Sequence, residues 1–113
     1  MAKVAGFYGV GAQEDAKNKD VKVTTHLSVY PNPAKRTVYI SCPVEKGMLL
    51  ECNIYDITGK LVRKLYKGIY NYDFLKLVWN GKDINGDDVK SGVYFVRLIT
   101  PKSYDCAKIV ITE

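Results

Sequence analysis

Histidine is almost absent from this sequence, and most histidine chemistry is excluded with it. His26 is the only histidine in 113 residues. A multi-histidine metal centre therefore cannot be built, and an acid–base triad has a single candidate base. Because His26 precedes the first strand-like segment, we interpret it as an exposed linker residue. We predict that the chain is not an enzyme and needs no cofactor.

Long apolar runs are also missing. The longest cover three or four residues, such as residues 93–96, whereas a membrane-spanning helix needs about 20. Near the amino terminus, Lys3 is followed by a short mixed segment and then by polar sequence, without the apolar stretch of a secretory signal. We predict no transmembrane segment, and we expect that any signal peptide lies outside this chain.

Charge of one sign is not concentrated anywhere. The 17 basic and 12 acidic residues give a net charge of +5, but lysine and arginine occur singly or in pairs such as Lys35-Arg36. No basic run or zinc-finger spacing is present, and the distribution is typical of a solvated surface. We predict no nucleic-acid partner. Binding to an anionic surface such as lipopolysaccharide, through charge spread over the domain, stays an open alternative.

Cysteine is scarce and irregularly spaced. Cys42, Cys52 and Cys106 match neither a CxxC redox pair nor a zinc pattern. We predict at most one disulfide, between Cys42 and Cys52, because both have inward parity on adjacent segments. Such a bridge requires their Cα atoms to lie within about 7 Å.

The sequence does contain a regular series of short β-branched and aromatic runs separated by turn residues. In one of them Leu50, Cys52 and Ile54 share a face while Glu51 and Asn53 share the other, as in a half-buried strand. No segment sustains a helical apolar pattern over three turns. Strands at spacings of about ten residues are typical of a β-sandwich. We predict seven, at residues 27–30, 37–42, 49–55, 61–67, 74–79, 92–100 and 105–112.

The amino-terminal residues differ in composition from the rest. Residues 11–20 contain no large apolar side chain and cannot bury surface to offset their ordering entropy. We therefore interpret residues 1–26 as a linker and residues 27–113 as one folded domain. Residues 4–8 are either the last strand of a preceding domain or an extra edge strand of this one.

Three short motifs occur in order along this domain. Pro-Asn-Pro follows the first strand, Gly-Val-Tyr opens the sixth, and Lys-Ile-Val-Ile lies near the carboxyl end. Together they resemble the type A C-terminal sorting domains of proteins exported by the type IX secretion system of Bacteroidetes. Residues 79–89 also resemble a loop of flagellar-hook-cap-type immunoglobulin-like domains. The residues that carry the sorting-domain resemblance are Pro31, Asn32, Pro33, Gly92, Tyr94, Lys108, Ile109, Val110 and Ile111.

Each motif also has a purely structural interpretation. Pro31 and Pro33 fix φ and remove two backbone donors, which makes a rigid corner that cannot pair. Gly92 permits a bulge or a close backbone approach, and Trp79 is most simply a core residue. We interpret these residues as fold determinants first, with recognition acting on the folded surface.

The resemblance implies an antiparallel, immunoglobulin-like sandwich that acts as an address for a cargo domain covalently attached upstream. It implies that the cargo reaches the periplasm and that the domain is presented to an outer-membrane translocon. A surface sortase would then cut within residues 9–21 and join the cargo to anionic lipopolysaccharide. The expected location is the cell surface or the medium.

Two other classes of function remain open from the sequence. One is a structural spacer or interaction module of a secreted multidomain protein. The other is a metal-binding or catalytic domain, for which the best candidates are Asp83, Asn85 and Asp87, because their spacing begins like an EF-hand loop. The pattern then fails, since Asp88 stands where glycine belongs and Tyr94 where a bidentate glutamate belongs. We therefore predict a turn built on Asn85-Gly86 and no metal.

Overall fold

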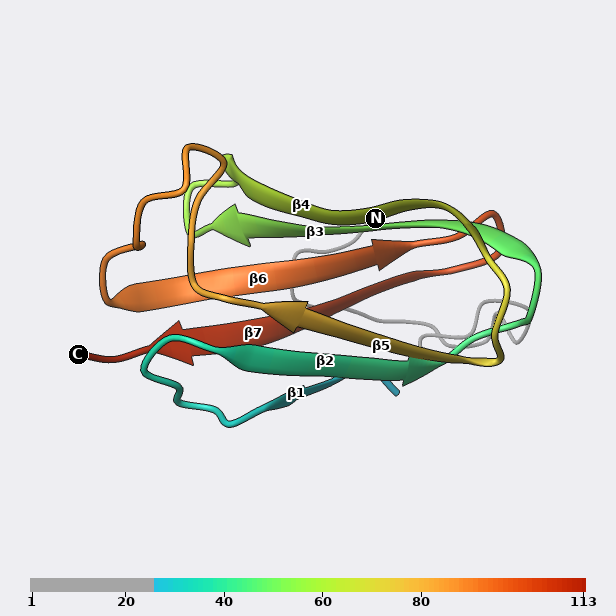
Figure 1. Cartoon of the computed structure of the whole chain (residues 1–113), viewed down its shortest axis with the longest axis horizontal. Coiled ribbons are helices and arrows are strands. Elements are labelled where there is room, and N and C mark those ends of the chain that lie inside the picture. The colour runs from blue at the N-terminus through green and yellow to red at the C-terminus, as the bar shows by residue number, and fades with distance from the viewer. Residues whose placement is uncertain (1–25) are drawn as a thin grey trace, which may run out of the picture.

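In a computed structural model, which describes residues 26–113, two antiparallel sheets pack face to face (Figure 1). Our predictions for residues 1–25 lie outside the described residues, whereas His26 is exposed as expected. No helix occurs among residues 26–113, and hence none that crosses a membrane. The strands are β1 (Ser28–Tyr30), β2 (Val38–Pro43), β3 (Met48–Asp56), β4 (Leu61–Tyr70), β5 (Phe74–Trp79), β6 (Gly92–Ile99) and β7 (Tyr104–Ile111).

The strand order confirms the predicted immunoglobulin-like sandwich. One sheet has the order β1-β2-β5 and the other β4-β3-β6-β7, with every neighbouring pair antiparallel. The chain crosses between the sheets after β2, β4 and β5, as in sandwiches with Greek-key connections. This topology leaves β7 at the edge of the second sheet, beside the connection between β1 and β2.

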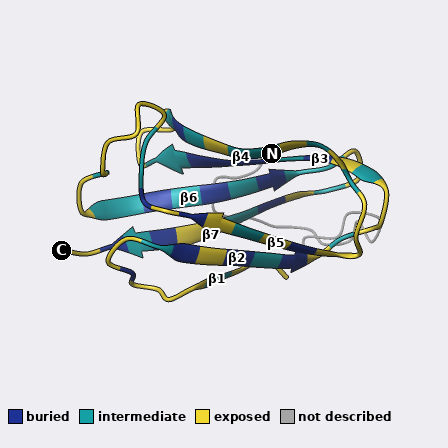
Figure 2. Cartoon of the chain, viewed as in Figure 1, coloured by how far each residue is buried: buried dark blue, intermediate teal, exposed yellow. Residues whose placement is uncertain are grey.

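The core lies between the two sheets and follows the period-2 pattern of each strand (Figure 2). Trp79 is completely buried, its indole N–H donates to the Lys82 carbonyl at 3.0 Å, and its ring meets that of Tyr94 edge-on at 5.5 Å. The predicted core role of Trp79 is confirmed. The other largest fully buried side chains are Ile40, Leu50, Ile54, Leu75, Leu98 and Ile109.

Two details of the strands differ from the sequence prediction. β4 continues through residues 68–70, which we had assigned to a connection, because this segment pairs in register with the start of β3. Asn53 is only 3% exposed although it lies on the polar face of β3. The strand register shifts between Cys52 and Asn53, and the Asn53 amide donates hydrogen bonds to Glu51 and Tyr55. We attribute the burial of the side chain to these two features.

Candidate functional site

The Pro-Asn-Pro corner and the carboxyl-terminal strand meet at one end of the sandwich. The Asn32 amide N–H donates to the Lys108 carbonyl at 2.8 Å, and its Oδ1 accepts from the Val110 N–H at 2.9 Å. These two bonds take the place of a neighbouring strand on the free edge of β7. Pro31 and Pro33 lack N–H groups, and residues 31–33 are exposed.

The backbone after the corner extends this contact. The Ala34 N–H donates to the Val110 carbonyl and the Thr112 N–H donates to the Ala34 carbonyl, each at 2.8 Å. Ala34 thereby forms a parallel bridge to Ile111. The last part of β7 is consequently held along both edges, by β6 on one side and by the corner on the other.

The Gly-Val-Tyr motif lies on the β6 side of the same strand. Gly92 is in register with Ile111, and Tyr94 with Ile109. The Tyr94 hydroxyl donates to the Lys90 carbonyl at 2.7 Å, the tyrosine-corner arrangement of immunoglobulin-like folds. Burial raises the pKa of this hydroxyl. Tyr94 is therefore a fold determinant.

Of the two roles that we expected for Gly92, a bulge or a close backbone approach, the structure shows neither, since β6 and β7 pair without a register shift there. A Cβ atom placed there would meet no atom within 4 Å. The backbone conformation provides the reason for glycine instead, because φ is +155°, a value that L side chains rarely adopt.

Side chains along β7 alternate as predicted. Ile109 and Ile111 are buried in the core, Lys108 is exposed, and Val110 is half-buried on the outer face. We call the outward-facing set formed by residues 31–33, Lys108 and Val110 the corner surface. The sorting-motif residues thus lie in the corner, on β7, or on β6 in register with β7.

The two hydrogen bonds from the Asn32 side chain to β7, which we call the clamp, support a stability prediction. Asn32→Ala removes both hydrogen bonds, and because water reaches the exposed edge we expect a loss of about 1–2 kcal/mol in the free energy of unfolding. Urea denaturation measures the loss, and hydrogen exchange of the Val110 amide should accelerate. Asn32→Asp keeps the acceptor for that amide and should fall between alanine and wild type. Unchanged stability and exchange in Asn32→Ala would show that the clamp contributes nothing.

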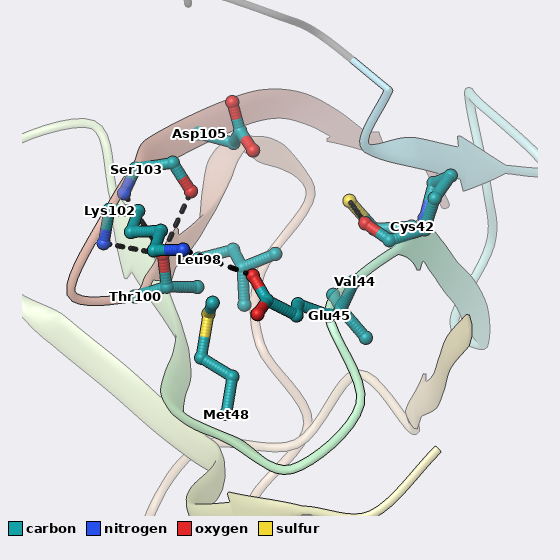
Figure 3. Close-up of a pocket in the computed structure, with 10 residues that line it drawn as sticks. Cys42, Val44, Glu45, Met48, Leu98, Thr100, Lys102, Ser103 and Asp105 are labelled. Atoms are coloured by element: carbon teal, nitrogen blue, oxygen red, sulfur yellow. Dashed lines mark hydrogen bonds and ion pairs between the residues drawn. The ribbon is translucent and has the colours of Figure 1, made fainter. Parts of the chain in front are cut away.

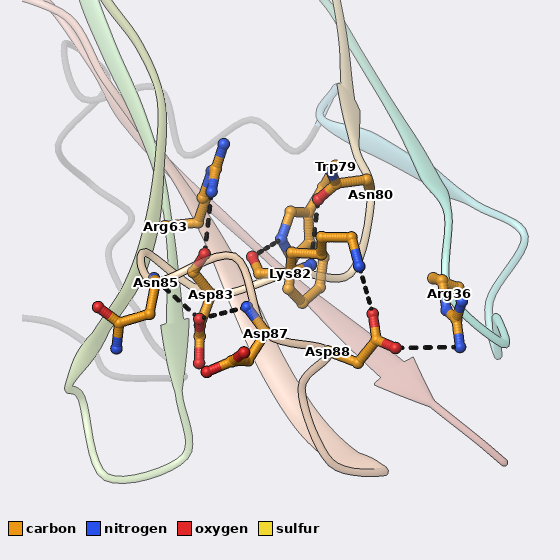
Figure 4. Close-up of polar contacts among 9 residues, drawn as sticks. All are labelled: Arg36, Arg63, Trp79, Asn80, Lys82, Asp83, Asn85, Asp87 and Asp88. Atoms are coloured by element: carbon orange, nitrogen blue, oxygen red, sulfur yellow. Dashed lines mark hydrogen bonds and ion pairs between the residues drawn. The ribbon is translucent and has the colours of Figure 1, made fainter.

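The loop that begins like an EF-hand is closed by its own backbone (Figure 4). The Asp83 Oδ1 accepts from the N–H groups of Asn85 at 2.9 Å and Asp87 at 3.0 Å. The Gly86 N–H donates to the Asp83 carbonyl at 2.9 Å, which forms a turn with Ile84 and Asn85 at its centre, one position before the predicted Asn85-Gly86 pair. The first carboxylate of the apparent calcium motif therefore acts as a turn cap.

Calcium is expected to leave the stability of the domain unchanged. A ligand present at a hundred times its dissociation constant would add about 2.7 kcal/mol if it bound only the folded state. Thermal unfolding in a chelator and in millimolar calcium should give the same midpoint. An increase of several degrees with calcium would restore Asp83 and Asp87 as candidate ligands.

The same loop contacts Arg36, between β1 and β2, through an ion pair (Figure 4) and through close backbone packing. Asp88 contacts Lys82 at 2.8 Å and Arg36 at 3.3 Å, and the hydrogen bond from Lys82 lowers the pKa of its carboxyl. Gly81 passes so close to the Arg36 carbonyl that a Cβ atom would lie 2.6 Å from it. Only glycine fits there.

The cysteines are separate from the corner surface. Cys42 and Cys52 have the predicted inward orientation and are buried, whereas Cys106 is half-buried. All three are free thiols in the structure. Burial raises the pKa of Cys42 to about 11 and that of Cys52 to about 12, and each keeps its proton at neutral pH. The disulfide between them stays a prediction.

Sequence reasoning missed two residues. The side-chain bonds of Asn32 were not anticipated, although a polar residue between two prolines has few local partners and is free to reach a distant one. Asp105 was also missed. It has the same parity as Ile109 and Ile111, which indicated a carboxylate facing the core.

The fold is thus an immunoglobulin-like sandwich in which the three sequence motifs meet at the carboxyl-terminal strand. The chain belongs to the family of secretion-system C-terminal sorting domains, whose sequence profile matches residues 28–112. This confirms the resemblance drawn from the three motifs. The family is a class of targeting domain and not of enzyme, and membership implies secretion toward the cell surface.

Two solved structures from Porphyromonas gingivalis share the fold. PorZ, an essential surface component of the type IX secretion system, gives a TM-score of 0.54 at 28% identity over 77% of this chain and 11% of that protein. Dimeric latent PorU gives 0.60 at 22% identity over 76% and 9%. The chain thus spans about a tenth of each protein. No curated protein is significantly similar to the chain.

Proposed function

We propose that the corner surface is the part of this domain that the outer-membrane translocon of the type IX secretion system reads. The observation that carries the proposal is the clamp between Asn32 and β7, which joins two of the three family motifs through hydrogen bonds of 2.8 and 2.9 Å. The clamp fixes the orientation of Lys108, which projects outward while its neighbour Ile109 is buried. A receptor would meet a rigid patch with one positive charge.

In this proposal the domain directs the export of a cargo domain that is covalently attached upstream of it. In this proposal a surface sortase removes the domain by cutting within residues 9–21 and joins the cargo to lipopolysaccharide. The matched family and the likeness to PorZ support a type IX route. Sequencing the amino terminus of the released domain from a competent host tests the cut. A terminus outside residues 9–21 contradicts it.

Export is expected to fail when the charge of Lys108 is reversed. The test is a reporter with its own signal peptide followed by residues 1–113, expressed in a type IX-competent host. Wild type should reach the surface, whereas Lys108→Glu should stay in the periplasm as a folded protein, because an exposed substitution changes stability by less than about 0.5 kcal/mol. Surface labelling and fractionation measure the distribution.

The matched control is Lys64→Glu, the same charge change on an exposed residue of β4. It should be exported like wild type. Deletion of residues 108–113 should abolish export, since it removes both the fold and the patch. Surface delivery of Lys108→Glu at the wild-type level would exclude this charge from recognition. Delivery of the deletion variant as well would leave the structural-spacer function in its place.

A further inference from the structure

A buried carboxylate lies at the end of the sandwich opposite the corner surface. Asp105 faces inward near the start of β7, in register with Leu98, and is only 7% exposed. Among residues 26–113, no lysine, arginine or histidine forms an ion pair with its carboxyl. Buried carboxylates are normally paired, and the unpaired state of Asp105 within the described fold requires an explanation.

Asp105 lines an open cavity of about 390 Å³ between the ends of the two sheets (Figure 3). Cys42 stands on the β2 side of this space. The side chains of Val44, Met48 and Leu98 supply apolar walls. The volume lies within the range of about 300–1,000 Å³ common for small-molecule sites, in which apolar walls surround a few polar groups.

The other polar groups around the cavity are already neutralised or occupied. Lys102 and Glu45 form an exposed ion pair of 3.3 Å, and their charges cancel. The hydroxyls of Thr100 and Ser103 bond each other at 2.9 Å, and Thr100 also caps its own turn. The remaining charge in the cavity is that of Asp105.

Two further titratable groups face Asp105. Cys42 stays a neutral thiol, because burial and then the nearby Asp105 charge raise its pKa to about 11. His26, from the segment before β1, is exposed and forms no ion pair with Asp105, but its charge acts on Asp105 and partly offsets the effect of burial on the pKa of that carboxyl. Burial raises the pKa of Asp105 to about 6, and the group is therefore predominantly ionised at pH 7 and above. The cavity then has an apolar lining and one desolvated negative charge.

We propose that this cavity binds an aliphatic ammonium group, with the charge on Asp105 and the alkyl stem against Val44, Met48 and Leu98. A single carboxylate with apolar walls suits an organic cation. A metal ion needs several ligands, and the described residues contain no group of three suitable side chains. The ammonium comes either from a free alkylamine or from a lysine side chain of a polypeptide.

Titration of the full 113-residue chain with n-butylammonium, followed by ¹⁵N and carboxyl ¹³C NMR, tests the proposal. We expect saturable shifts at Asp105 and Leu98 with a dissociation constant on the order of millimolar. Ammonium chloride, which lacks the stem, and n-butanol, which lacks the charge, should each bind at least about tenfold more weakly. Equal effects from all three compounds would overturn the proposal.

Variants separate the site from general attraction of a cation to a negative surface. Asp105→Asn should weaken n-butylammonium binding at least about tenfold, while Glu45→Gln, which removes the exposed carboxylate at the mouth, should retain it. Should Asp105→Asn bind as well as wild type, Asp105 is not the anchor. An Asp105→Asn spectrum that is otherwise native, with dispersed Ile109 and Trp79 signals, shows that any loss does not result from unfolding.

A last comparison distinguishes the two sources of the ammonium group. A blocked lysine, Nα-acetyl-lysine methylamide, carries the same stem and charge with peptide bonds attached. Tighter binding of the blocked lysine than of n-butylammonium indicates a polypeptide ligand, and weaker binding indicates a free amine. Absence of shifts with both compounds at concentrations well above millimolar would overturn the proposal. Neither result depends on export of the protein.

Discussion

Ile109→Ala is expected to lower the free energy of unfolding by about 2–5 kcal/mol, a large fraction of the about 5–15 kcal/mol by which native proteins are stable. Ile109 is completely buried and lies in register with Tyr94 on β6. Truncation removes three methyl or methylene groups and leaves a cavity between the two sheets. Urea denaturation followed by Trp79 fluorescence measures the loss, because that ring is buried in the same core.

The neighbouring residue provides the control. Lys108→Ala lies on the same strand, one position away, but is exposed, and the expected change is below about 0.5 kcal/mol. A loss of more than about 2 kcal/mol in Lys108→Ala would contradict the assigned orientation of β7. A negligible loss in Ile109→Ala would contradict it equally.

Asp105→Asn is expected to stabilise the domain at neutral pH. Burial raises the pKa of this carboxyl from 3.8 to about 6, and the folded state therefore holds the proton more tightly than the unfolded state. Stability from this group is full below pH 4 and decreases as the pH rises toward 6. Asparagine stays neutral and avoids that decrease. The gain at pH 7 should be about 1–3 kcal/mol, since each pH unit of separation corresponds to about 1.4 kcal/mol.

The measurement is the difference in unfolding free energy between Asp105→Asn and wild type at several pH values. The difference should be near zero at pH 4 and reach its maximum above pH 6. Comparison of the two proteins cancels the opposite contributions of Asp56 and Asp88, whose pKa values are lowered by hydrogen bonds. A difference that is constant with pH would mean that Asp105 has an ordinary pKa in the folded protein.

The seven strands could be predicted from the sequence because period-2 alternation and turn residues are local signals. Residues 74–79, for example, alternate so regularly that the predicted and observed limits of β5 agree. The continuation of β4 to Tyr70 could not be read locally, because it depends on pairing with Met48 in another strand.

The site was predictable only in part for the same reason. The motifs identified Asn32 and Lys108, and parity placed Lys108 outside and Ile109 inside. The local sequence does not indicate that the Asn32 amide bonds to two groups of β7, because these bonds depend on how the whole sandwich packs. The cavity at Asp105 is likewise formed by loops that are distant in sequence and come together only in the folded chain.

The hydrogen bonds between Asn32 and β7 depend on the folding of the whole sorting domain. Asn32 and Val110 are separated by 78 positions, and every strand from β2 to β6 lies between them in the chain. A domain that ends before Val110, or whose two sheets have not assembled, cannot form this hydrogen bond. If a receptor reads the assembled corner as proposed, it would accept only sorting domains that have been synthesised to their carboxyl-terminal strand and have folded.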